Sequence, residues 1–116
     1  MTKWPATLAL LLLCGCDPEI EISGTVFAND GGVAKGTKID LACTGTAKFT
    51  MPTSTQTDSQ GRFSLKGTGC LPASCVVSSG AGFRKVEQPL MEWCTKSAPS
   101  CPAGSCVNAS GNLTLP

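Results

Sequence analysis

The chain has 116 residues, with 9 Lys or Arg, 8 Asp or Glu, and neither His nor Tyr. This length is enough for one ordinary domain, and a near-neutral chain without a basic block does not predict nucleic-acid binding. Without His or Tyr, acid–base catalysis would have to use scattered carboxylates, lysines or free thiols. Composition therefore favours a non-catalytic protein, and we expect no cofactor.

The first fifteen residues have the pattern of an export signal. Lys3 is the one charged residue before Asp17, Ala6–Leu13 is almost wholly apolar, and Gly15 is a small residue at the end of the run. These are the three parts of a cleaved signal peptide. The apolar run is too short for a hydrocarbon core of about 30 Å, which a helix of about 20 residues spans. We therefore predict that residues 1–15 are removed.

The order Leu-x-Gly-Cys at Leu13–Cys16 resembles the bacterial lipobox, in which the cysteine becomes the acylated first residue. The resemblance implies lipidation of Cys16, with palmitate among the acyl chains, and attachment to a membrane of the bacterial cell envelope. Whether this is the inner or the outer membrane stays open. Two alternatives are a simple secretory cut after Gly15, without lipid, and an uncleaved anchor, which the short apolar run disfavours.

The cysteine count agrees with export. Of eight cysteines, Cys14 would leave with the signal and Cys16 would carry lipid, which leaves six. An even number in an exported chain fits three disulfides, whose pairing the sequence does not choose. No two of these six cysteines have only two residues between them, and His is absent, so neither a metal site nor a thioredoxin-like site is expected. We expect the bridge from Cys43 to be the most buried. The six are Cys43, Cys70, Cys75, Cys94, Cys101 and Cys106.

Alternation of apolar and polar residues predicts short strands after the signal. No window has a sustained helical apolar face, although Pro89–Lys96 is a weak helix candidate. Short strands between turns predict an all-β fold, an antiparallel β-sandwich of about seven strands. The alternating segments are Ile20–Val26, Ile39–Cys43, Thr53–Thr57, Phe63–Leu65, Cys75–Ser78 and Phe83–Val86, followed by Leu113 and Leu115.

Clusters of Gly, Asn, Asp and Ser separate these segments at Asn29–Gly32, Asp58–Gly61 and Ser79–Gly82. A single acid in a four-residue turn cannot supply the six to eight oxygens that Ca²⁺ takes. We therefore expect the Asp58 carboxylate to accept hydrogen bonds from the backbone of its own turn. Gly61 is placed to take a positive φ.

Part of the chain, Ile22–Phe83, resembles the carboxypeptidase regulatory-like domain. Thr57–Leu65 matches that family's Thr-Asp-x-x-Gly-x-Phe-x-Leu hairpin. The resemblance implies a transthyretin-like β-sandwich that acts as a non-catalytic accessory module, with no active-site residues to carry over. Weaker likenesses to its strands are Ile22–Val26, Gly36–Leu41 and Val76–Ser78, the last followed by Gly82 and Phe83.

Trp93 is the candidate partner contact, because an exposed indole in a loop with Pro and Cys is a common anchor for partners. The alternative is that it covers one end of the sandwich beside Cys94. Two glycosylation sequons, at Asn108 and Asn112, are expected to be turn residues in a bacterial protein.

These features divide the chain into a signal peptide at 1–15, a lipidated Cys16 and short tether at 16–19, and a sandwich domain at 20–116 with a Cys- and Pro-rich tail. The expected function is a lipid-anchored, non-catalytic cell-envelope module for adhesion, scaffolding or protein interaction. Its expected partners are the membrane and another envelope protein. The alternatives are a cysteine-based redox protein and a small secreted, disulfide-rich inhibitor or effector without lipid.

Overall fold

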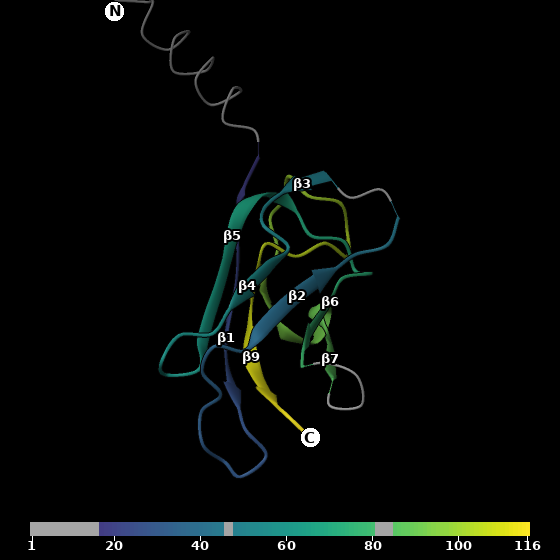
Figure 1. The fold of residues 1–116 in the computed structure, drawn as a ribbon. Helices are drawn as coiled ribbons and strands as arrows, with labels where there is room; N and C mark the ends of the chain where they lie inside the picture. Colours follow the sequence, from purple (N-terminus) through teal and green to yellow (C-terminus); the bar gives the residue numbers. More distant parts are fainter. Residues whose placement is uncertain (1–16, 46–47, 81–84) are drawn as a thin grey trace, which may run out of the picture.

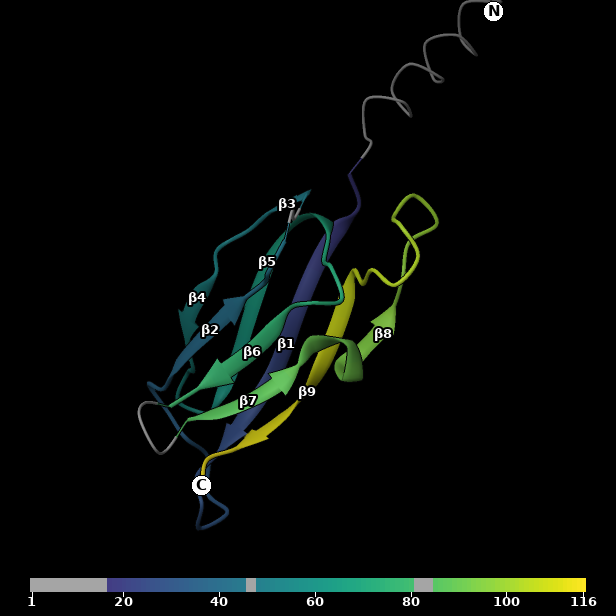
Figure 2. The same cartoon turned by 90° about the vertical axis from the view of Figure 1, so that its right-hand side faces the viewer.

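The computed structural model describes residues 17–45, 48–80 and 85–116, so the predicted signal peptide and Cys16 lie outside the described residues. Two β-sheets pack face to face (Figures 1 and 2). One sheet has five strands in the order β3-β5-β1-β9-β8, and the other has four in the order β4-β2-β6-β7. The predicted all-β sandwich is confirmed.

Nine strands are present in the described residues, where about seven were expected. The extra strands are short: β3 and β8 have three residues each, too few for an alternating pattern to show in the sequence. The bounds are β1 Glu19–Phe27, β2 Lys38–Ala42, β3 Lys48–Thr50, β4 Ser54–Gln56, β5 Arg62–Cys70, β6 Val76–Ser79, β7 Val86–Pro89, β8 Cys94–Lys96 and β9 Asn108–Thr114.

Strand β1 is central in its sheet and begins at Glu19, one residue before the predicted start. It pairs antiparallel with β5 and parallel with β9, so that Ile22 lies opposite both Leu65 and Ala109. The sheet is therefore mixed, where a purely antiparallel one was expected. The parallel pair arises because β8 and the loop after it return the chain to the end at which β1 begins, and β9 then runs beside β1 in the same direction (Figure 2).

The core lies between the inward rows of the two sheets. Ile22 and Leu65 from one sheet and Ile39 and Val77 from the other are at most 2% exposed. Full burial of one such aliphatic side chain is worth about 1.5–3 kcal/mol. The apolar residues of these alternating segments thus form the buried faces that hold the two sheets together.

The turn at Asp58–Gly61 forms as expected. The Gly61 N–H donates to the Asp58 carbonyl oxygen at 3.0 Å, and Gly61 has a φ of 74°. The flanking strands do not form the expected hairpin, because β4 and β5 belong to different sheets. Thr57 explains the difference, since its buried hydroxyl donates to the Ala34 carbonyl oxygen at 2.6 Å and accepts from the Thr37 N–H at 2.9 Å. These bonds tie the segment before the turn to the connection before β2.

The helix candidate Pro89–Lys96 is mostly wrong. It contains one 3-10 turn, η2, at Leu90–Trp93, and then strand β8. This segment carries the chain from β7, at the edge of the four-stranded sheet, to β8, at the edge of the five-stranded sheet. Of the predicted strand Phe83–Val86, residues 83 and 84 lie outside the described residues, and β7 begins at Val86.

The two sequons do not lie in turns. Both asparagines belong to β9, where Asn108 pairs with Glu21 and Asn112 with Thr25. The polar residues of β9 alternate with buried Ala109 and Leu113 and face away from the core. Because these outward residues are Asn, Ser and Thr, the strand has the composition of a turn.

Candidate functional site

Three disulfides join the cysteines as Cys43–Cys75, Cys70–Cys101 and Cys94–Cys106. The predicted set of three bridges is confirmed, and the structure supplies the pairing that the sequence left open. The Cys43 bridge is not uniquely buried. Its partner Cys75 is 1% exposed, but Cys106 of another bridge is 0% exposed, and Cys43 itself is only half-buried.

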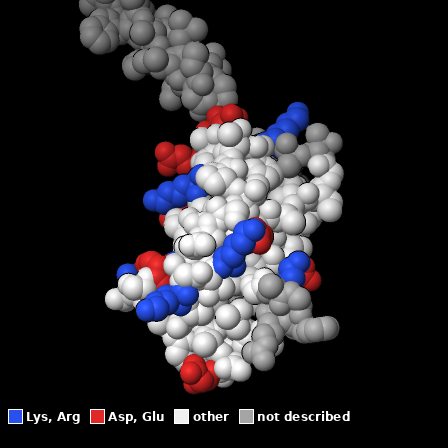
Figure 3. Space-filling model, in the orientation of Figure 1, with Lys and Arg blue, Asp and Glu red and all other residues white. Residues whose placement is uncertain are grey.

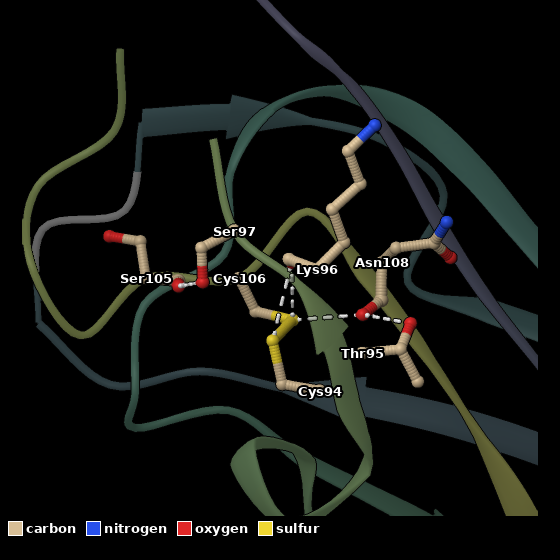
Figure 4. Close-up of a disulfide and its surroundings, with 7 residues drawn as sticks. All are labelled: Cys94, Thr95, Lys96, Ser97, Ser105, Cys106 and Asn108. Carbon is tan, nitrogen blue, oxygen red and sulfur yellow. Dashed lines mark hydrogen bonds between the residues drawn. A yellow bond between two sulfur atoms is a disulfide. The ribbon is translucent and has the colours of Figure 1, made fainter. Parts of the chain in front are cut away.

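Polar contacts surround the Cys94–Cys106 bridge (Figure 4). The Thr95 hydroxyl donates to the Asn108 carbonyl oxygen, and the Ser97 hydroxyl donates to the Ser105 carbonyl oxygen, each at 3.1 Å. The Cys106 sulfur lies 3.1 Å from the Asn108 carbonyl oxygen, a sulfur–oxygen contact, because a disulfide sulfur carries no proton. Residues 97–105 therefore form a loop whose ends are joined by a hydrogen bond between Ser97 and Ser105, and the Cys94–Cys106 disulfide links the segments that flank it.

The loop 97–105 is also fixed at its middle. Cys101 is bonded to Cys70 at the end of β5. Within the loop, the Cys101 N–H donates to the Ala98 carbonyl oxygen at 3.0 Å, and the Ser105 N–H donates to the Pro102 carbonyl oxygen at 3.1 Å. Two successive turns and two disulfides thus hold the Cys- and Pro-rich tail against the end of the sandwich at which β1 begins.

Two hollows lie at that end, which we call the Asp17 end. The larger has a volume of about 810 Å³, and the smaller about 450 Å³. In the larger one Lys66 Nζ lies 3.9 Å from Glu21 Oε2. Both acids and bases line each hollow: Glu19, Glu21, Lys66 and Lys96 the larger, and Asp17 and Lys48 the smaller. Such mixed, exposed groups could contact a polar or zwitterionic surface but offer no buried acid–base pair.

Charge is also mixed on the face of the molecule shown in Figure 3, where cationic and anionic side chains are interspersed. Among the described residues, no three or more His, Cys, Asp or Glu side chains are grouped closely enough to hold a metal ion. The same residues include no helix with the length and apolar character needed to cross a bilayer.

Trp93 is not an exposed partner contact. Its side chain is 9% exposed and belongs to the core, with its ring centroid 6.4 Å from that of Phe63. The indole lies against Gly111 of β9, which has no side chain to occupy that space. The expectation of an exposed indole is therefore wrong, and Trp93 packs against Phe63 of β5 and Gly111 of β9.

The Asp58 carboxylate behaves as the sequence predicted. Its Oδ1 accepts the Arg62 N–H at 2.9 Å and the Gln60 N–H at 2.8 Å. These bonds from Arg62 and Gln60, with a smaller contribution from the Arg62 charge, lower the pKa of Asp58 below its usual value. The group is fully exposed, so its role is to fix the turn rather than to perform chemistry.

A lowered folded-state pKa gives a defined pH dependence. Because the folded pKa of Asp58 lies below its unfolded value, its stabilising contribution is present above the unfolded pKa of about 3.9 and is lost as the pH falls through the folded value. Asp58→Ala is therefore expected to destabilise the protein at neutral pH and much less near pH 2. Urea unfolding at both pH values tests this, with Ser59→Ala in the same turn as a pH-independent control. Equal destabilisation by Asp58→Ala at both pH values would contradict it.

The described chain is thus a two-sheet, all-β sandwich with three disulfides and a cross-linked loop at the Asp17 end. No protein-family profile matches the sequence, and no curated protein matches it. Among solved structures, it is similar to catechol 1,2-dioxygenase from Acinetobacter sp., inhibited by bound mercury, with a TM-score of 0.53 and 15% identity. The match covers 85% of this chain and 52% of that chain, so this chain spans about half the length of the enzyme chain. At this identity the likeness shows a shared β-sandwich fold alone.

Proposed function

We propose that the protein is a lipid-anchored, non-catalytic β-sandwich module of the bacterial cell envelope that acts by adhesion, scaffolding or interaction with other envelope proteins. The observation that carries this proposal is the position of Cys16. It ends a Leu-x-Gly-Cys sequence, and the first strand begins three residues later at Glu19.

The disulfides support export. All six cysteines after Cys16 are paired in the structure. Disulfides form and persist in oxidising compartments such as the periplasm and the cell surface, and they are rare in the bacterial cytosol. Paired cysteines also give a redox protein no free thiol in the described part of the chain, which favours a structural role for them.

The proposal includes the resemblance to the carboxypeptidase regulatory-like domain and its transthyretin-like sandwich, which rests on the sequence segments named above. The segments that carry the likeness fall on β1, β2, the turn before β5, and β6. Those segments occupy both sheets. A non-catalytic role fits the chemistry of the surface, where the four ion pairs of the described residues are exposed and do not gather at one site.

The short segment between Cys16 and β1 determines which end of the module lies at the membrane. Only Asp17 and Pro18 separate Cys16 from β1, and three extended residue steps span about 10 Å. The Asp17 end, with its two hollows and the loop 97–105, would therefore lie at the head groups. A partner of this module must itself lie in or against a membrane.

Substitution of Cys16 tests the anchor. Each buried CH₂ contributes about 0.8 kcal/mol, and stable attachment needs more than one acyl chain. The native protein is expected in the membrane fraction, with an intact mass that includes acyl chains. Cys16→Ser should give a larger, unacylated precursor, whereas Cys14→Ser should be processed and acylated like the native protein. A soluble, unacylated native protein would contradict the anchor, and free thiols among the other six cysteines would favour the redox alternative.

A further inference from the structure

Most exposed edges of the two sheets carry features that prevent pairing with another strand. A free edge is a template for strand addition, and short length, charge, Pro or irregular pairing protects it. Strand β3 has three residues including Lys48, and β4 has three residues after Pro52. Strand β7 contains Glu87 and Pro89, and β8 contains Lys96 and an irregular register.

The second half of β9 has none of these features. Strand β8 pairs with β9 only as far as Ala109. Beyond that point, Ser110–Thr114 has β1 on one side and, within the described residues, no strand on the other (Figure 2). The segment contains no charged residue and no Pro. It is therefore a sheet edge without charge or Pro and with no described strand beside it, and η2 (Leu90–Trp93) is a described element that contacts β9 near this edge.

The hydrogen bonds of β9 show which backbone groups are open. The Glu21 N–H donates to Val107, and the Leu115 N–H donates to Phe27, so the odd-numbered residues of this segment face β1. Backbone groups alternate in direction along a strand, so the even-numbered ones face away. The open groups are the carbonyl of Ser110 and both groups of Asn112 and Thr114, and all three side chains are exposed.

We propose that two copies of the protein pair antiparallel through this edge, with the two-fold axis beside Leu113. Asn112 of one copy then lies opposite Thr114 of the other. Each of these two residues donates its N–H to the carbonyl oxygen of the other. The edge is self-complementary, as an isologous interface must be. If the axis lay at Asn112 instead, Leu115 of one copy would lie opposite Ala109 of the other copy. Cys94 of that copy already pairs with Ala109, so this register is blocked. Because the edge carries no charge, the two copies approach without repulsion.

The small size of this contact makes the pair loose. A few backbone bonds bury far less than the area of about 1,200–2,000 Å² typical of stable complexes, so we expect a dissociation constant of about 0.1–1 mM. Antiparallel pairing also sets the two β1 strands in opposite directions, with the two Asp17 ends far apart. Resting on the proposed lipid anchor, this geometry joins copies held in two facing membranes, where many weak contacts act together. The adhesion is then between like molecules.

Sedimentation velocity of the purified mature protein in detergent, from about 10 µM to 1 mM, tests the pairing. The native protein should sediment faster as its concentration rises. Asn112→Pro removes an N–H that points away from β1 and should abolish the increase, whereas Asn112→Ala keeps the N–H and should preserve it. A native protein that stays monomeric throughout, or equal association of a folded Asn112→Pro variant, would overturn the proposal.

Charge substitutions keep the test independent of proline and of the anchor. A double variant with Asn112→Lys and Thr114→Lys should be monomeric, and so should the matching double variant with Asp at both positions. Their mixture should associate, because opposite charges then meet across the edge. On lipid vesicles, native protein should cluster the vesicles and Asn112→Pro should not. Protein that binds vesicles without clustering them contradicts the pairing, whereas protein absent from vesicles contradicts the anchor.

Discussion

Reduction of the three disulfides is expected to unfold the protein at room temperature. The bridges close loops with sequence separations of 32, 31 and 12 residues. In the chain-entropy account they contribute about 3.7, 3.7 and 2.8 kcal/mol, respectively. Their sum of about 10 kcal/mol is comparable to the whole free energy of unfolding of an ordinary domain, about 5–15 kcal/mol.

The fluorescence of Trp93 reports this unfolding directly, because the only other tryptophan, Trp4, lies in the predicted signal peptide. The buried indole should shift to the emission of a solvated one when reductant and an alkylating agent are added. Alkylating agent alone is the control and should leave the spectrum unchanged. A reduced and alkylated protein that kept a native spectrum and a cooperative thermal transition would show that the packed core suffices without the bridges.

The sequence predicted the elements whose physics is local. Alternation marked β1 and β2 because each has one face in the core and one in water. The turn at Asp58–Gly61 was predictable because its own carboxylate and its own glycine determine it. The number of disulfides was predictable because six cysteines, an even number, remain when Cys14 and Cys16 are set aside, and this count does not depend on the fold.

Features that depend on distant parts of the chain escaped prediction. The parallel pairing of β9 with β1 and the choice of disulfide partners depend on how residues 94–107 return to the Asp17 end. Strand β8 is too short to show a period. Trp93 was nominated as an exposed contact because it lies in a segment with Pro and Cys, and only the packing reveals that Gly111 leaves space for the indole.

The candidate site was predicted in part. The cysteine set was predicted, but the hollows at the Asp17 end were not, because Glu21, Lys66 and Lys96 come from three separate strands. The open edge of β9 was also missed. Its alternating polar residues at 108–114 resembled turns with sequons, and the absence of a neighbouring strand is a property of the sheet rather than of the segment.

Gly111→Val is expected to destabilise the protein by about 3 kcal/mol or more, because a Cβ at this position would overlap the Trp93 indole. Overpacking a filled core costs about 1–3 kcal/mol, and a large buried ring cannot easily move aside. Urea unfolding followed by circular dichroism measures the change. Ser110→Val, one residue earlier on the exposed face of the same strand, is the matched control and should change stability by less than about 0.5 kcal/mol.

A double-mutant cycle identifies the source of the cost. Trp93→Ala alone should destabilise by about 3–5 kcal/mol, and in that background Gly111→Val should cost much less because the cavity accepts the new methyl groups. The contrary outcome is also informative. A Cβ at the neighbouring Gly24 would overlap the Gly111 carbonyl, so β1 and β9 already approach closely here. An undiminished cost in the Trp93→Ala background would mean that this backbone contact, rather than the indole, requires glycine at position 111.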